Sequence, residues 1–266
     1  MTEISRMQSV ARATKVLRAI TEAQDEDGWT RGAEIAEATG LHRGTVHRFL
    51  RAWVYEGWVE HDEKSRRYRI GLSLLALSAT AAGKNRFLSV ARSAVAALAE
   101  KTGDTAYLFQ HAGLDGVCME RQAGSHPIQY LATHVGNRVP LGRMAGTIAI
   151  LSALDERTAA YIIDENISRN DVFAQAGRRY YLDAVDTARR QGYAETEGTL
   201  IPGIRGFGVP LMVGNQVAGG LSLAVMKDRL EGDHRTVVLK ALKEQAAQVR
   251  RIMNPGNERE TVRKAV

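Results

Sequence analysis

The sequence predicts an α+β protein with three parts: an N-terminal winged helix-turn-helix domain, a linker helix, and a C-terminal antiparallel sheet domain flanked by helices. Three observations lead to this prediction. Two short helical patterns meet at Gly40, and a hairpin pattern follows them directly. Beyond Thr105, strand and helix patterns follow one another without the regular strand–helix repeat of a parallel sheet.

The stretch Ala33–Leu50 has the pattern of two short helices joined by a tight turn. Gly40 supplies the turn residue, because glycine accepts a positive φ without a steric penalty. Apolar residues recur at helical spacing on both sides of this turn, and we expect them to face inward. They are Ile35, Ala36, Ala38, Leu41, Val46, Phe49 and Leu50.

The second helix of the pair is expected to carry its cations at its start. Between Ala38 and Tyr55 the chain has arginines and histidines but no acid. A helix-turn-helix presents such positions to base edges and phosphates in the major groove of DNA, although a solvated helical hairpin is the alternative. The predicted DNA-binding residues of this helix are His42, Arg43, Thr45, His47 and Arg48.

A β-hairpin is predicted over Glu56–Ile70, where Gly57 ends the helix and apolar and polar residues then alternate. A hairpin in this place makes the domain a winged helix. Its return strand is strongly cationic, which favours contact with phosphates or the minor groove over a merely charged, solvated strand edge. The wing residues predicted to contact DNA are Arg66, Arg67 and Tyr68.

Helical periodicity also predicts a first helix over Ser9–Ile20, a connecting helix over Leu72–Gly83 and a further helix over Phe87–Lys101. We therefore expect a DNA-binding domain at 1–71, a linker helix at 72–85 and a second domain at 86–254. Residues 255–266 are polar and are expected to form a disordered tail.

The second domain is expected to contain an antiparallel sheet. The predicted strands are Ala106–Phe109, Gly116–Glu120, Ile128–Ala132, Gly192–Glu197, Gly206–Val213 and Gln216–Val225. The predicted helices are Ala145–Leu154, Glu156–Glu165, Arg179–Gln191 and Asp233–Met253.

Composition bounds the class of protein. The chain has 266 residues, a formal net charge of +6 and a single cysteine, Cys118. One cysteine excludes an internal disulfide and fits a reducing compartment. No apolar run approaches the roughly 18 residues that a bilayer span needs, and the first residues lack a signal-peptide pattern. We therefore expect a soluble cytoplasmic protein without a membrane partner.

Taken together, the motifs resemble those of IclR-type bacterial transcriptional regulators, over nearly the whole length. The resemblance implies a winged-helix domain, a linker helix and a GAF- or PAS-like effector-binding domain. It also implies a homodimer or a dimer of dimers on double-stranded DNA with a palindromic operator. The segments that carry it are Ala33–Leu50, Glu56–Leu72, Val135–Leu141, Gly192–Ala194, Pro202–Pro210 and Leu221–Leu223.

The resemblance further implies a pocket for a small effector between the sheet and the loops that cover it. Its residues would be Leu131, Val139, Ala145, Gly146, Gly206 and Ser222, with Ala224 and Glu197 nearby. Independently of the family, the helix starting near Met144 would offer free backbone N–H groups to a carboxylate. Arg143 could pair with the same carboxylate in bidentate fashion, although an arginine at a helix start is more often solvated or paired with an acid of the protein.

This chain departs from the family at Leu141-Gly-Arg-Met-Ala145, where many relatives read Leu-His-Ala-Thr-Ala. It also has Gly206 and Ala224 where some relatives carry a polar or thiol side chain. These departures argue against the small keto acids that some members bind, and favour aromatic or other organic acids.

No catalytic residue, metal site or cofactor is predicted. Gly203-x-x-Gly206-x-Gly208 lacks the strand-then-helix context of a dinucleotide site, and close backbone approach explains it better. Cys118 with His111 or His126 is more simply a core thiol than a nucleophile. Two alternatives to a regulator remain open: an enzyme or sensor acting on a small acid with an incidental helix-turn-helix, and a constitutive architectural DNA binder.

Overall fold

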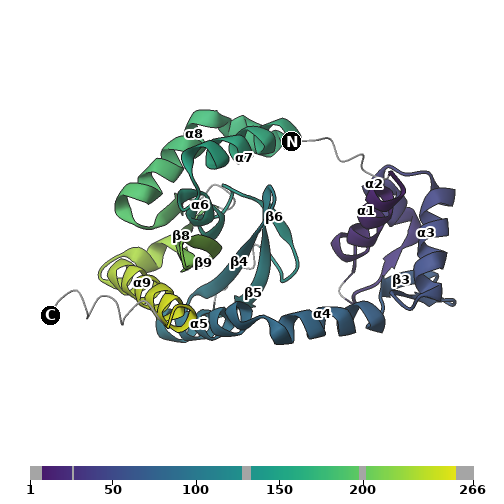
Figure 1. Cartoon of the computed structure of the whole chain (residues 1–266), viewed down its shortest axis with the longest axis horizontal. Coiled ribbons are helices and arrows are strands. Elements are labelled where there is room, and N and C mark those ends of the chain that lie inside the picture. The colour runs from purple at the N-terminus through teal and green to yellow at the C-terminus, as the bar shows by residue number, and fades with distance from the viewer. Residues whose placement is uncertain (1–7, 26, 128–132, 198–201, 256–266) are drawn as a thin grey trace. The chain divides into compact units, whose positions relative to one another are not determined.

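The computed structural model describes residues 8–25, 27–127, 133–197 and 202–255, and the chain divides into two compact units, Met1–Asn85 and Arg86–Val266. Figure 1 shows the elements of each unit. The strand expected at Ile128–Ala132, which includes Leu131, and nearly all of the tail expected at 255–266 lie outside the described residues.

The first unit is a winged helix-turn-helix, as predicted. Its strands form an antiparallel sheet of order β1-β3-β2, in which β2 and β3 make the wing. The short strand β1 was not predicted, because two residues give no alternation to detect. The elements are α1 (Gln8–Glu22), β1 (Thr30–Arg31), α2 (Gly32–Thr39), α3 (Arg43–Tyr55), β2 (Val59–Asp62) and β3 (Arg67–Ile70).

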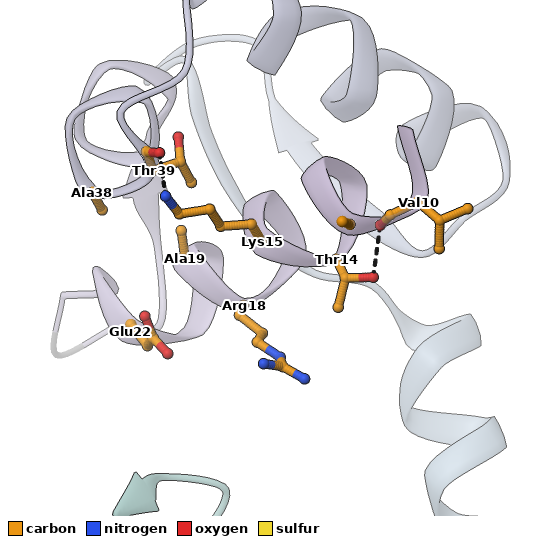
Figure 2. A pocket seen from close by; sticks show the side chains of 9 residues that line it. Val10, Thr14, Lys15, Arg18, Ala19, Glu22, Ala38 and Thr39 are labelled. Atoms are coloured by element: carbon orange, nitrogen blue, oxygen red, sulfur yellow. Dashed lines mark hydrogen bonds between the residues drawn. The ribbon is translucent and has the colours of Figure 1, made fainter. Parts of the chain in front are cut away.

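The expected apolar stripes form the core of this unit, with one correction. Ile35 and Ala36 are buried as predicted, but Ala38 is exposed and the last inward position of α2 is Thr39. Ala38 lines an open groove between α1 and α2 together with Val10, which is 57% exposed (Figure 2). In this groove Lys15 Nζ donates to the carbonyl of Thr39 at 2.6 Å, so the last carbonyl of α2 has a hydrogen-bond partner.

The predicted linker helix is present as α4 (Leu72–Lys84). Its start is tied to the wing, since the N–H of Gly71 donates to the Trp58 carbonyl at 2.7 Å. A Cβ on Gly71 would clash with the Gly57 carbonyl, so only glycine permits this close approach. None of the residues of α4 is buried.

The second unit is built on an antiparallel sheet of order β6-β5-β4-β9-β8-β7. Helices α6 and α8 pack on one side of it, with α7 against α8, while α5 and α9 pack together on the other side (Figure 1). The fold class is therefore α+β, as predicted. The strands are β4 (Thr105–Ala112), β5 (Asp115–Gln122), β6 (Arg138–Pro140), β7 (Ala194–Glu197), β8 (Ile204–Val213) and β9 (Gln216–Met226). The helices are α5 (Arg86–Thr102), α6 (Ala145–Ser152), α7 (Glu156–Arg169), α8 (Asp171–Gln191), the short η1 (Lys227–Leu230) and α9 (His234–Met253).

Helix α8 begins eight residues earlier than its apolar periodicity indicated, at Asp171 rather than Arg179. Gly177 interrupts it with φ 77° and ψ 154°, so two helical segments meet at a sharp kink. The periodic pattern is broken at this glycine, and only the second segment was therefore recognised in the sequence.

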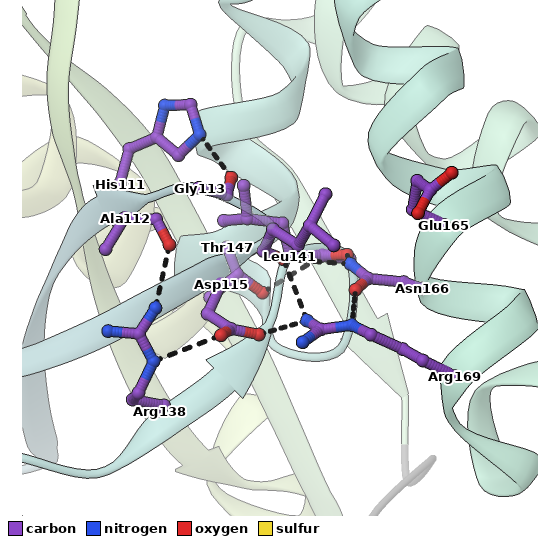
Figure 3. A network of polar contacts seen from close by, with 12 residues as sticks. His111, Ala112, Gly113, Asp115, Arg138, Leu141, Thr147, Glu165, Asn166 and Arg169 are labelled. Carbon is purple, nitrogen blue, oxygen red and sulfur yellow. Dashed lines mark hydrogen bonds and ion pairs between the residues drawn. The ribbon is translucent and has the colours of Figure 1, made fainter. Parts of the chain in front are cut away.

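The loop that leads into α6 is held by polar contacts from α7 and from strands β5 and β6. Asn166 of α7 is fully buried, and its Nδ2 donates to the carbonyls of Leu114 and Leu141 at 3.0 and 3.1 Å. Asp115 binds Arg138 and Arg169 on either side, as Figure 3 shows. Because Asn166 binds the carbonyl of Leu141, this network fixes where the amino end of α6 begins.

Candidate functional site

The amino end of α3 combines a side-chain cap with a cation. His42 is the N-cap, and its Nδ1 accepts a hydrogen bond from the N–H of Gly44 at 3.2 Å. Arg43 follows as the first helical residue, and the first turn has no acid. A cation at this end opposes the helix dipole, at a cost of about 0.3–1 kcal/mol. A phosphate or base edge would offset that cost.

The predicted cations of α3 share its solvent side. Arg43, His47 and Arg48 are exposed and Thr45 is half-buried, while Val46 and Leu50 face the core. One more cation belongs to this surface and was not predicted: Arg51 follows Arg48 by three residues and is also exposed. Its helical spacing was the signal that could have identified it.

The tip of the wing presents two cations that bind no acid in the described part of the chain, Lys64 and Arg66. Arg66 has φ 54°, the left-handed region that side chains rarely adopt. Asp62 holds the turn by accepting hydrogen bonds from the backbone of Lys64 and Ser65. The turn is therefore ordered with both cations pointing to solvent.

Two of the predicted wing contacts are corrected by the structure. Tyr68 is only 8% exposed, and its ring packs in the core of the first unit, stacked on His61. Arg67 is paired with Asp25 at 2.6 Å and joins the wing to the loop after α1. Alternation along β3 explains the first error, since Tyr68 pairs with Thr30 on the buried side of the sheet.

In the second unit, glycines let α6 lie directly on the sheet. The strand register aligns Gly206 with Ala224 and Gly208 with Ser222, on one face of β8 and β9. A Cβ at Gly206 would lie 3.1 Å from the Cβ of Ala145, and one at Gly208 would lie 2.5 Å from the Ala145 carbonyl. The close backbone approach expected of this glycine-rich segment is therefore present.

The amino end of α6 carries backbone donors without a partner in the described part of the chain. No described residue accepts a hydrogen bond from the N–H groups of Ala145 or Gly146, and both residues are buried. Ser222 is 4% exposed, and its hydroxyl has no partner among the described residues. A Cβ on Gly146 would lie 2.8 Å from Ser222 Oγ, so the Ser222 hydroxyl lies beside the first turn of α6. Backbone N–H groups left unpaired at a helix start can bind an anion.

Comparison with known proteins now identifies the family. Residues 9–63 match the model of the IclR helix-turn-helix domain, and residues 65–251 match that of the bacterial transcriptional regulator IclR C-terminal domain. The chain belongs to the IclR family. It is a transcriptional regulator with a DNA-binding helix-turn-helix and an effector-binding domain.

This IclR-family chain is similar to regulators of known name over most of their length. It is 25% identical over 228 residues to the HTH-type transcriptional regulator XynR of Escherichia coli, covering 85% of this chain and 88% of that one. It is 26% identical over 262 residues to the glycerol operon regulatory protein of Streptomyces coelicolor, covering 94% and 98%. A crystallised IclR transcriptional regulator from Alicyclobacillus acidocaldarius superposes with a TM-score of 0.78 at 29% identity, covering 93% and 99%. A homologue from Microbacterium hydrocarbonoxydans, crystallised with 4-hydroxybenzoate, gives a TM-score of 0.73 at 18% identity, covering 93% and 100%.

Of the effector residues expected for an IclR-family pocket, the structure brings Ala145, Gly146, Gly206, Ser222 and Ala224 together. Val139 is buried in the same apolar core, and Met144 is the N-cap of α6. Leu131 lies outside the described residues.

Glu197 does not belong to this set of effector residues. It pairs with Arg205 in the strand register, one position from the Thr196–Gly206 pair, so its side chain lies on the opposite face of the sheet. There it forms an ion pair with Arg205 at 2.6 Å. The polar residue on the face of Gly206 is Thr196, which strand alternation could have identified.

No described group of histidine, cysteine and acidic side chains could hold a metal ion in this IclR-family structure. Burial raises the pKa of the Cys118 thiol to about 11. The thiol therefore stays protonated at neutral pH, as expected of a core cysteine. None of the described helices combines the length and the apolar composition that a bilayer span requires.

Proposed function

We propose that the protein binds a palindromic operator through α3 and the wing, and that a small organic acid in the second unit changes this affinity. Arg43, Thr45, His47 and Arg48 enter the major groove, with His42 at its edge. Lys64 and Arg66 contact the phosphate backbone. The observation that carries this proposal is the cation at the amino end of an acid-free helix, beside a wing tip with two unpaired cations.

The effector we propose is an organic acid, with an aromatic acid as the favoured class. Its carboxylate would accept hydrogen bonds from the N–H groups of Ala145 and Gly146, and Ser222 would donate a further one from the sheet. The homologue crystallised with 4-hydroxybenzoate gives support to an aromatic ligand, although it shares only the fold at 18% identity.

Gel shift on the chain's own promoter region, combined with a thermal-shift screen of organic acids, tests the proposed function. We expect binding that weakens steeply with salt, because each phosphate contact releases counterions. We expect an effector acid to raise the melting temperature, since a ligand selective for the folded state stabilises it by mass action. Turnover of the acid without any DNA shift would instead indicate an enzyme. DNA binding with no ligand stabilisation across the screen would indicate a constitutive binder.

We propose further that the protein is a homodimer, or a dimer of dimers, in which α4 takes part in the contact between chains. Leu72, Leu75 and Leu77 are 71%, 54% and 58% exposed on this helix. Exposed apolar side chains concentrated on one element are typical of an interaction surface. An effector would act by favouring one spacing of the two recognition helices, since half-sites one helical turn apart tolerate little misalignment.

Replacing both Leu72 and Leu75 with serine is expected to weaken self-association at least tenfold. The measurement is mass by light scattering across a dilution series. The matched control is Tyr161→Ser, which removes an apolar side chain that is 54% exposed on α7 instead. An unchanged mass in the double variant would contradict the role of α4.

A further inference from the structure

A cavity of about 250 Å³ lies between the loop before α6 and the kinked helix α8, and its lining includes none of the residues by which α6 contacts the sheet. Its walls include the rings of Phe173, Tyr180 and Tyr181, and Arg143 contributes the one charged side chain of its lining. Ligand pockets for drug-sized molecules span roughly 300–1,000 Å³. This cavity therefore has the size for a molecule of a single ring.

The aromatic walls are fixed by the geometry of α8. Phe173 and Tyr181 stack with ring centroids 3.7 Å apart and planes inclined by 7°. Tyr180 meets Tyr181 edge to face at 5.1 Å. The kink at Gly177 lies between Phe173 and the tyrosines, and it lets the second helical segment bring Tyr181 onto the ring of Phe173. Phe173 and Tyr181 cover one another and are only 2% and 6% exposed, whereas Tyr180 is 40% exposed, so Tyr180 is the ring on which a flat ligand can stack.

Gly142 makes room for this ring pair. It has φ 107°, and a Cβ there would lie 2.9 Å from Phe173 Cζ and 3.3 Å from Tyr181 Cδ1. Gly142 and Arg143 both shape this cavity. The glycine leaves room for the rings of Phe173 and Tyr181, and the arginine places a positive charge beside them.

Arg143 has no carboxylate partner among the described residues and is half-buried. Most arginines of this unit that lie equally deep are paired, as Arg138 is with Asp115 and Arg205 with Glu195. Burial raises the pKa of Tyr181, Tyr180 adds to this effect, and the positive charge of Arg143 opposes it. The guanidinium therefore lies near the ring of Tyr181 and forms no ion pair with an acid in the described part of the chain.

We propose that this cavity is a second ligand site, specific for a single-ring aromatic carboxylate. The ligand ring stacks on Tyr180, which the buried Phe173–Tyr181 pair supports, and Arg143 binds the carboxylate through two parallel N–H···O hydrogen bonds. The site is separate from the seat at the amino end of α6, and it does not depend on the effector role proposed for that seat. Arg143, predicted from the sequence as part of the sheet-side pocket, is assigned to this cavity instead.

Benzoate is the probe that tests the proposal, with its neutral analogue benzamide as the comparison. NMR spectra of the full chain labelled at its tyrosine rings report on the two sites separately. The Tyr180 and Tyr181 signals, assigned through Tyr180→Phe and Tyr181→Phe, report on this cavity. The Tyr107 signal reports on the other site, because Tyr107 pairs with Ser222 in the sheet. We expect benzoate to shift Tyr180 and Tyr181 saturably, and benzamide to bind at least tenfold more weakly.

Arg143→Gln is expected to weaken the benzoate-induced shifts at least tenfold and to remove the preference for benzoate over benzamide. Arg143→Lys should retain part of the affinity for benzoate, because lysine keeps the positive charge but lacks the two parallel N–H donors of the guanidinium. The matched control is Arg157→Gln, which removes an exposed arginine of α7 and should leave the titration unchanged. Unchanged shifts in Arg143→Gln would overturn the proposal. Shifts of Tyr107 alone would also overturn it, while supporting the sheet-side effector pocket. Promoter binding is measured by gel shift and not by these tyrosine signals. Failure of the regulatory proposal would therefore be distinguished from failure of the ligand site.

Discussion

Arg43→Ala is expected to weaken operator binding by about 1–3 kcal/mol, with the loss confined to one base pair of each half-site. The same substitution should leave the first unit as stable as before or slightly more stable, because it removes a cation from the positive end of α3. Loss of binding without loss of stability separates a DNA contact from a structural role. Binding is measured against a series of single-base operator variants, and stability by thermal unfolding.

Arg66→Ala is the companion variant, and its expected effect is different in kind. A phosphate contact carries no sequence information, so its loss should weaken all operator variants alike and reduce the salt slope by about one. Arg12→Ala is the matched control, since it removes an exposed arginine of α1 from the same unit. If Arg43→Ala and Arg66→Ala both bind as tightly as the unchanged chain, α3 and the wing are not the DNA interface.

The elements of both units could be predicted because their signals are local. Period and turn residues identified α3, the wing, α4 and five of the six strands now described in the second unit. Side-chain contacts between residues far apart in the sequence could not be predicted in this way. Arg67 looked like a free cation of the wing, but its partner Asp25 lies 42 residues earlier. Nothing in a single sequence indicates such a contact.

The misplacement of Glu197 in the candidate effector site follows from the two-residue alternation of strands. Shifting a residue by one position moves its side chain to the other face of the sheet. Glu197 was chosen for its charge, yet Thr196 lies on the face of Gly206. The cavity to which we assign Arg143 could not be predicted from the sequence either. The sequence gives the distance of Arg143 from the helix start, but the cavity depends on the rings of α8 and the kink at Gly177.

Gly220→Ala is expected to destabilise the second unit by about 1–3 kcal/mol or more, as overpacking of a tight contact does. A Cβ at Gly220 would clash with the carbonyl oxygen of Gly146, a backbone atom that cannot rotate away. Helix α6 would have to lift from the sheet, so the N–H groups proposed to seat the effector would move with it. We therefore expect stabilisation by an effector acid to be lost together with part of the fold stability. The first unit should be unaffected, because it contains no residue of this contact.

Gly83→Ala is the matched control, since a Cβ there meets nothing within 4 Å and the residue lies inside α4. Exchanging glycine for alanine in a helix is expected to stabilise the chain by about 0.5–1 kcal/mol, which is opposite in sign to the effect of Gly220→Ala.

The two units are followed separately in one melting experiment. Trp29, Trp53 and Trp58, the three tryptophans of the chain, all lie in the first unit and report on it by fluorescence, while circular dichroism follows the whole chain. Were Gly220→Ala to melt like the unchanged chain, α6 would not be pressed on the sheet as described, and the anion seat at its amino end would lose its physical basis.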